Sequence, residues 1–194
     1  MTTLILREGA DRLHVELNRP DVRNAINDDM VDELHAVCTS LEREPRILIL
    51  TGTSTPERGV FAACADIRQL LERGRDEALA GINSGLFTRI ARLPMPVIAA
   101  VDGFAIGGGA ELAYAADIRI ASTRAVFGNP ETAIGILAGC RKAEKTGNAS
   151  GASGVVRSIP NIVLAYSTGP YSSRDAKRAS GRFLIPPNRG VSSL

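Results

Sequence analysis

Residues 96–112 read P-V-I-A-A-V-D-G-F-A-I-G-G-G-A-E-L, and this stretch indicates more about the fold than any other. Its beginning, residues 97–101, is a continuous apolar run typical of a strand buried on both faces. The run leads to Gly103 and then to three consecutive glycines at residues 107–109. Glycines placed there allow a tight turn and bring backbone N–H groups close to a ligand. The stretch predicts a strand, a glycine turn and a helix at residues 112–116.

The alternation of strand and helix continues on both sides of this stretch. Alternating apolar and polar residues predict a strand at 13–17, and short apolar runs predict strands at 47–50 and 118–121. Apolar spacing and flanking cap residues predict helices at residues 27–41, 65–73 and 84–93. Strands alternating with helices in this way are typical of an α/β domain with parallel strands.

Composition excludes several classes of protein. The 194 residues suffice for one domain with its own core, and 44% hydrophobic with 23% charged residues is ordinary for a soluble globular protein. The lack of Trp and the 4% aromatic share argue against a stacking surface for nucleic acid. No secretory leader, membrane-spanning run or metal-ligand spacing of cysteines is found, so we expect a cytoplasmic protein without membrane or nucleic-acid partners.

The charge pattern divides the chain at residue 139. Residues 1–139 contain 14 arginines, no lysine and 19 acidic residues, for a net charge of −5. Residues 140–194 contain 9 basic and 2 acidic residues, for a net charge of +7, and are rich in Gly, Ser and Pro. We therefore predict two parts: a folded core at 1–139 and an atypical, disordered tail at 140–194.

Two glutamates stand next to apolar residues in the sequence. Glu111 follows the glycines in an apolar setting, and Glu131 follows Pro130 in F-G-N-P-E. The first N–H groups of a helix have no intrahelical partner and can bind a phosphate or a developing negative oxygen. Two carboxyl groups in one apolar cleft can act as acid and base. The residues alone leave open that the glycines serve only packing and that either glutamate is a helix cap or a surface residue.

Four motifs together resemble one known family. They are L-N-R-P-x-x-x-N-A (17–25), F-A-A-C-A-D-I (61–67), P-V-I-A-A-V-D-G-F-A-I-G-G-G-A-E-L (96–112) and F-G-N-P-E (127–131). In this order and spacing they resemble the enoyl-CoA hydratase/isomerase, or crotonase, family. The resemblance implies an α/β spiral of strand-strand-helix repeats, here truncated after residue 139.

The resemblance also implies a function and site residues. It implies an enoyl-CoA hydratase that adds water across the 2,3 double bond of an enoyl-CoA thioester in lipid metabolism. The backbone N–H groups of Ala65 and Gly108 would form an oxyanion hole, and Glu111 and Glu131 would be catalytic. The substrate-binding residues implied for coenzyme A are Arg23, Ala25, Ala65, Asp66, Ile67 and Arg68. No metal or other cofactor is implied, since coenzyme A is part of the substrate.

Two departures from the family pattern keep alternatives open. Cys64 stands where the family usually has glycine, which predicts a strained turn if that position needs a positive φ. Alternatively, the Cys64 thiol itself acts as a catalytic nucleophile. After Gly139 the C-terminal helices with which the family forms trimers or hexamers are not recognisable. Three explanations stay open: a reading-frame change, a foreign end, or divergence of a genuine tail. An isomerase or other acyl-CoA lyase and an inactive truncated remnant are the alternative functions.

Overall fold

The computed structural model describes residues 2–53, 59–66, 69, 81–130, 155–156 and 162–166, the last two ranges as backbone only. The described part contains a six-stranded sheet in the order β1-β2-β3-β5-β7-β10. Its strands are β1 (Leu4–Glu8), β2 (Arg12–Leu17), β3 (Ile47–Gly52), β5 (Val97–Val101), β7 (Ile118–Ser122) and β10 (Ile162–Tyr166). The first two strands form an antiparallel hairpin, and every later pair runs parallel.

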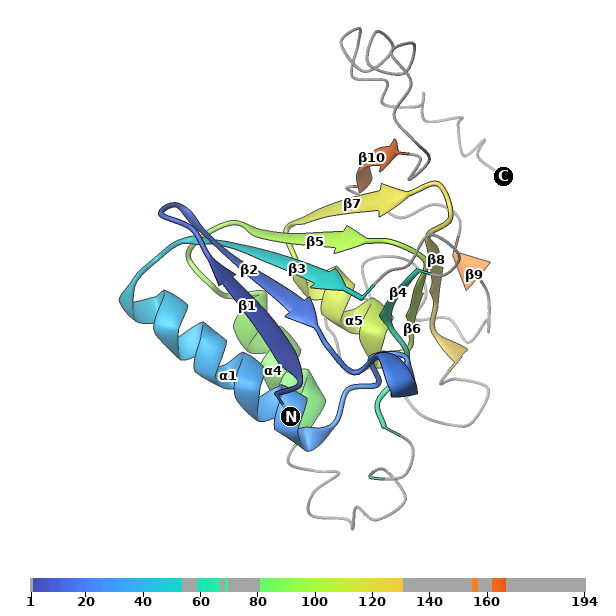
Figure 1. The fold of residues 1–194 in the computed structure, drawn as a ribbon, viewed down its shortest axis with the longest axis horizontal. Helices are drawn as coiled ribbons and strands as arrows, with labels where there is room; N and C mark the ends of the chain where they lie inside the picture. Colours follow the sequence, from blue (N-terminus) through green and yellow to red (C-terminus); the bar gives the residue numbers. More distant parts are fainter. Residues whose placement is uncertain are drawn as a thin grey trace, which may run out of the picture.

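A second sheet lies at the carboxyl ends of these parallel strands, and its strands run crosswise to the first sheet (Figure 1). It has the order β4-β6-β8-β9 among the described residues, with β8 and β9 antiparallel and the other pairs parallel. Its strands are β4 (Val60–Ala62), β6 (Phe104–Ile106), β8 (Val126–Gly128) and β9 (Val155–Val156). Three parallel strands of the first sheet, β3, β5 and β7, are each followed in the chain by a short strand of the second, β4, β6 and β8.

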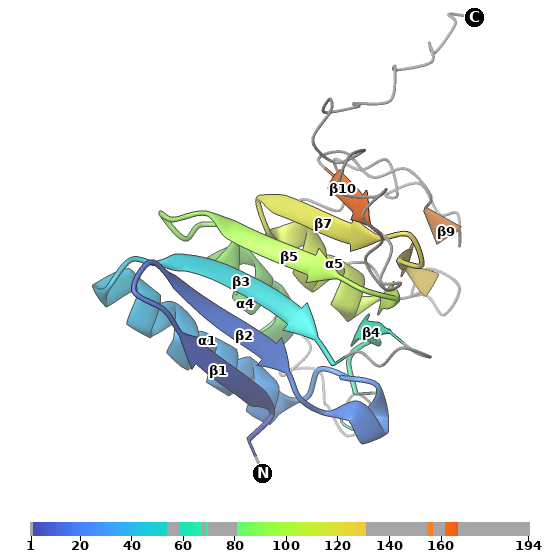
Figure 2. The same ribbon diagram turned by 45° about the horizontal axis from the view of Figure 1, so that its top comes forward.

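Among the described residues, three helices lie against the six-stranded sheet, all on the same face in both views (Figures 1 and 2). They are α1 (Asp28–Arg43), α4 (Ile82–Ile90) and α5 (Gly108–Ala115). The order β5, β6, α5 makes one complete strand-strand-helix turn, and β3, β4 and α4 follow the same order. The predicted spiral of strand-strand-helix repeats is therefore confirmed for these elements.

The longest helix follows directly from its sequence. The side chain of Asn27 caps α1 by accepting the backbone N–H of Met30 at 3.1 Å, which satisfies one of the free donors at the helix start. Asp28 and Asp29 in the first turn and Arg43 in the last complement the helix dipole. Its buried residues recur at helical spacing and form one apolar stripe: Met30, Val31, Leu34, Val37, Cys38 and Leu41.

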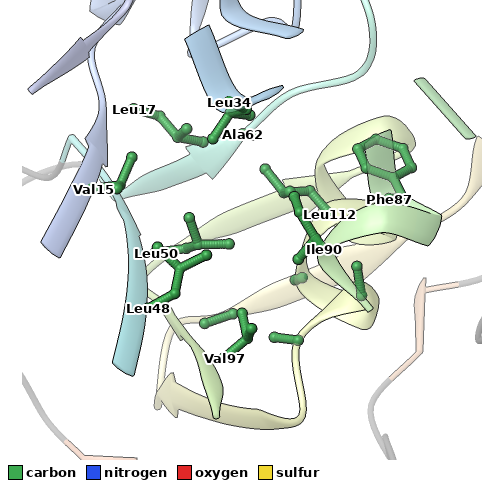
Figure 3. Close-up of a cluster of buried hydrophobic side chains, with 14 of the residues drawn as sticks. Val15, Leu17, Leu34, Leu48, Leu50, Ala62, Phe87, Ile90, Val97 and Leu112 are labelled. Carbon is green, nitrogen blue, oxygen red and sulfur yellow. The ribbon is translucent and has the colours of Figure 1, made fainter. Parts of the chain in front are cut away.

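The core fills the space between the sheet and the helices (Figure 3). Leu48 and Leu50 of β3 and Val97 of β5 point toward Leu34, Phe87, Ile90 and Leu112 of the helices, and all are at most 1% exposed. Alternate residues of each strand lie inside because side chains in a strand alternate between its two faces. Truncating one such side chain to alanine would cost about 2–5 kcal/mol of stability. This core holds the carboxyl ends of β3 and β5, and with them the second sheet, in place.

Several predicted element boundaries need correction. The helix predicted at 112–116 begins at Gly108, because the backbone turns at Gly107 and leaves the next two glycines helical. The helix predicted at 84–93 is α4, which ends at Ile90. Ala65, predicted as the first residue of a helix, is not helical and pairs as a β-bridge with Ile26, while most of the remaining residues to 73 lie outside the described part.

The strands of the second sheet were not predicted. β4, β6 and β8 have three residues each, too few for a period of two to be recognised. Within residues 140–194 the structure also describes β9 beside β8 and β10 beside β7, and the sequence predicts neither. The rest of that segment lies outside the described residues.

Candidate active site

The glycine turn places the start of α5 at the edge of the second sheet. Gly107 has φ 56° and ψ −125°, a conformation open almost only to glycine, and its N–H donates to the Gly128 carbonyl at 2.7 Å. Because β6 and β8 are parallel, their carboxyl ends meet at this edge. The turn therefore aims the free N–H groups of a helix start at the place where both strands end.

The first helical turn of α5 lies directly against residues 62–65. A Cβ atom added at Gly109 would stand 2.1 Å from the Ala62 carbonyl oxygen, which is a severe overlap. A Cβ atom at Gly108 would stand 3.3 Å from the Ala65 nitrogen. Gly109 thus serves close packing of helix on strand, whereas Gly108 lies beside the backbone amide of Ala65. The sequence had left these two roles of the glycines open.

The pairing of Ala65 leaves its amide on the side of the helix. Ile26 N–H donates to the Cys64 carbonyl at 3.2 Å, and Asp66 N–H donates to the Ile26 carbonyl at 2.9 Å. In a parallel bridge of this kind the N–H of the middle residue, Ala65, points away from Ile26. Within the described part of the chain, no acceptor receives the N–H of Ala65 or of Gly108. Two neighbouring backbone donors are the arrangement that binds a developing oxyanion.

Glu111 lies one helical turn beyond Gly108, on the same face of α5. Its side chain is buried, with 5% of the residue exposed, and every residue of α5 is buried. The backbone N–H of Glu111 donates to the Gly107 carbonyl at 2.9 Å, so the glycine turn fixes this position as well. A glutamate in a helix whose every residue is buried differs from an ordinary helix glutamate, which is exposed to solvent. The surface or cap position that the sequence had left open for Glu111 is therefore excluded.

The other predicted site residues lie along the segment that pairs with residues 63–66, or outside the described part. The carbonyl of Arg23, a residue in the left-handed region at φ 56°, accepts Ala63 N–H at 2.9 Å. The carbonyl of Ala25 accepts the Arg19 guanidinium at 2.5 Å, and the same guanidinium reaches the Asp66 carboxylate at 3.2 Å. Three predicted site residues lie outside the described part of the chain: Glu131, Ile67 and Arg68.

Three residues of the site region were not singled out by the sequence, although all lie inside the quoted motifs. Arg19 joins two segments of the site, as described above. Asn24 is 1% exposed and donates from its side chain to the Val60 and Phe61 carbonyls at 3.2 and 3.1 Å. Asn129 is 8% exposed, and neither its Oδ1 nor its Nδ2 has a partner among the described residues. The burial of a side-chain amide distinguishes such residues, and sequence patterns alone do not reveal that burial.

The strain predicted at Cys64 is not found. Among the described residues only Arg23 and Asn24 are non-glycine residues with positive φ, so Cys64 lies in an ordinary region of backbone conformation. The two histidines are engaged elsewhere, His14 with Thr51 Oγ1 at 2.7 Å and His35 with Arg89 at 3.2 Å. A cysteine–histidine pair for nucleophilic chemistry therefore has no support at Cys64.

The described residues also show no site for a metal ion built from three or more His, Cys, Asp or Glu side chains. In the same part of the chain, no helix is both long and apolar enough to cross a membrane.

Comparison with known proteins identifies the family. The family model described as enoyl-CoA hydratase/isomerase matches residues 9–178. The chain belongs to this family. It is 39% identical over 143 residues to a short-chain-enoyl-CoA hydratase of Clostridium acetobutylicum, covering 72% of this chain and 54% of the relative. It is 41% identical over 125 residues to the mouse (Mus musculus) enoyl-CoA hydratase domain-containing protein 2, mitochondrial, covering 63% of this chain and 42% of that protein.

Solved structures of the family share the fold. The enoyl-CoA hydratase of Thermoplasma volcanium superposes with a TM-score of 0.74 at 29% identity, covering 93% of this chain and 76% of that chain. The predicted crotonase-like α/β fold is therefore confirmed. The chain spans about half the length of the curated relatives it matches, at 54% and 42% of the two named here.

Proposed function

We propose that this chain hydrates 2-enoyl-CoA thioesters. The observation that carries the proposal is the buried Glu111, which lies one helical turn from the place where Gly108 meets the Ala65 amide. In this proposal the N–H groups of Ala65 and Gly108 bind the thioester oxygen. Polarising that oxygen draws electrons away from C3 of the enoyl group, which prepares it for attack by water.

The proposed reaction uses the two glutamates as base and acid. Glu111 takes a proton from the attacking water as its oxygen bonds to C3. Glu131 gives a proton to C2, so that the product is a 3-hydroxyacyl-CoA. The addition is neither an oxidation nor a reduction, and it calls for no redox cofactor. Positioned acid–base groups contribute about 10²–10⁴ in rate, and one oxyanion donor about 10²–10³.

Coenzyme A is proposed to lie along the two paired segments of the site region. The proposed contacts come from the segment containing Arg23 and Ala25 and from the segment containing Asp66, Ile67 and Arg68. Support for this placement is the backbone pairing that brings the two segments together, from Ala63 N–H to the Arg23 carbonyl and from Asp66 N–H to the Ile26 carbonyl.

Incubation with crotonyl-CoA tests the function and separates it from its alternatives. A hydratase gives a product one water heavier by mass spectrometry, whereas an isomerase leaves the mass unchanged. We expect Glu111→Gln to lower kcat by at least about 10²-fold. The matched control is Glu42→Gln, which alters a 43% exposed glutamate in the last turn of α1. This variant should keep wild-type kcat.

Two outcomes contradict the proposal. Wild-type turnover by the Glu111→Gln variant would remove Glu111 from the chemistry. A wild-type chain that melts cooperatively but gives no heavier product would favour an inactive remnant of the family. Thermal melts of both variants show whether a loss of activity reflects a loss of fold.

A further inference from the structure

The guanidinium of Arg19 joins the two segments that meet at Ala65. Its Nη1 donates to the Ala25 carbonyl at 2.5 Å, and Nη1 and Nη2 both donate to Asp66 Oδ2 at 3.2 Å. The side chains are 21% and 16% exposed for Arg19 and Asp66, so the pair is largely removed from water. A partly buried pair with several hydrogen bonds constrains geometry more than an exposed one does.

This contact completes a series of bonds along the edge of the proposed oxyanion site. Ala63 N–H donates to the Arg23 carbonyl at 2.9 Å. Next along the edge, Ile26 N–H donates to the Cys64 carbonyl and Asp66 N–H donates to the Ile26 carbonyl. The contact with Arg19 then fixes the side chain of Asp66, the residue directly after Ala65. Both the peptide before Ala65 and the residue after it are thereby held.

Arg19 is itself held in place by Asn24. Arg19 N–H donates to Asn24 Oδ1 at 2.8 Å, and Asn24 N–H donates to the Arg19 carbonyl at 2.8 Å. Asn24 is 1% exposed and has φ 54°, a left-handed conformation that asparagine tolerates better than most residues. The loop that carries the guanidinium is therefore closed on itself, which lowers the entropy lost in forming its hydrogen bonds.

We propose that Arg19 and Asp66 are a positioning pair for the oxyanion site. The pair keeps the Ala65 amide aimed at the acyl oxygen, and it neutralises the carboxylate of Asp66. Without Arg19, that negative charge one residue away would oppose the charge that develops on the thioester oxygen. This inference rests on the proposed function, in which Ala65 and Gly108 are the oxyanion donors.

The carbonyl stretching frequency of a bound acyl-CoA reports the aim of the donors. Butyryl-CoA labelled with ¹³C at its thioester carbonyl lacks the double bond and binds without reacting. Hydrogen bonds to its oxygen lower the frequency, so we expect a clear downward shift in wild type by infrared difference spectroscopy. In Arg19→Met most of this shift is lost and kcat for crotonyl-CoA falls about 10- to 100-fold, while KM changes less than about threefold.

A matched control separates positioning from general stability. Arg89→Met breaks an arginine–glutamate pair between α4 and α1, whose side chains are 30% and 43% exposed, and neither residue belongs to the segments that meet at Ala65. It should lower the melting temperature yet leave the carbonyl shift and kcat as in wild type. Arg19→Lys keeps the positive charge but not the planar guanidinium with its several donors. It should recover part of the carbonyl shift and part of kcat.

Removing both charges tests the electrostatic part of the inference. The double variant Arg19→Met with Asp66→Asn should be more active than Arg19→Met alone, because it also removes the negative charge of the residue that follows Ala65. Should Arg19→Met fail to melt cooperatively, Arg19→Lys and Asp66→Asn give the same two readouts, each with a smaller loss than Arg19→Met is expected to show.

The outcomes distinguish this inference from the proposed function. No carbonyl shift in wild type would remove Ala65 and Gly108 as oxyanion donors and with them the proposed function. A normal shift in wild type that persists in Arg19→Met, with unchanged kcat, would overturn the positioning pair and leave the proposed function intact.

Discussion

Three helical glycines differ in what surrounds them, so replacing each by alanine should have a different effect. A Cβ atom at Gly85 in α4 has no atom within 4 Å to meet, whereas one at Gly109 in α5 would stand 2.1 Å from the Ala62 carbonyl oxygen. A Cβ atom at Gly108 is intermediate, 3.3 Å from the Ala65 nitrogen. None of the three has a positive φ, so the comparison isolates packing from backbone strain.

The magnitudes follow from two opposing contributions. Alanine stabilises a helix interior by about 1 kcal/mol relative to glycine. At Gly109 the overlap with backbone atoms forces α5 away from β4, at a cost of about 3 kcal/mol, the upper part of the range for overpacking. The net loss of about 2 kcal/mol lowers the melting temperature by about 4–8 °C for a chain of this size. Gly85→Ala should instead raise it by about 2–4 °C.

Gly108→Ala separates stability from activity. Gly108 is the first residue of α5, where helix propensity counts for little, and its 3.3 Å contact is mild, so the melting temperature should stay within about 4 °C of wild type. The new methyl group stands beside the Ala65 amide, however, and kcat with crotonyl-CoA should fall at least about tenfold.

Thermal melts followed by far-UV circular dichroism, with kcat measured on the same samples, check the series. A Gly109→Ala variant that melts at or above the wild-type temperature would contradict the close packing of α5 on β4. A loss of stability in Gly85→Ala, which has room for its methyl group, as large as that in Gly109→Ala would contradict it as well.

Two predictions concern titratable groups away from the site. Burial, and then the nearby Arg7, lower the pKa of His14 below its ordinary value of 6.5, so its protonation opposes folding. The stability that this group contributes is present above about pH 6.5 and is lost as the pH falls through the lowered pKa. Between about pH 8 and pH 5, the melting temperature should therefore fall less in His14→Gln than in wild type. An equal fall in both proteins would contradict this prediction. Burial raises the pKa of the Cys38 thiol to about 11. About one Cys38 in a thousand is then ionised at pH 8, so iodoacetamide should modify it only after denaturation, as judged by peptide mass mapping, and rapid labelling of the native chain would count against the buried placement.

Much of the local structure could be predicted from the sequence, because it depends on neighbouring residues. The apolar stripe and Asn27 cap of α1 are both readable from residues three or four apart. The apolar runs likewise predicted the strands β3 and β5, but only alternate residues of each strand are buried, so the expected burial on both faces is not found. The start of α5 was placed too late because glycine is a poor helix former, and only the turn at Gly107 shows where the helix begins.

The site was only partly readable for a different physical reason. The sequence placed Glu111 among apolar residues, directly before the helix predicted at 112–116, and resemblance assigned the family. It could not show that Gly108 lies against the Ala65 amide, nor that Arg19 and Asp66, 47 residues apart, share hydrogen bonds. Those contacts arise where the second sheet crosses the ends of the first, and the three-residue strands that form the crossing leave no periodic signal. Composition and spacing thus determined the longer strands and helices. The packing of α5 against β4 decided which backbone amides meet, and the pairing of residues 23–26 with residues 63–66 decided which charges meet.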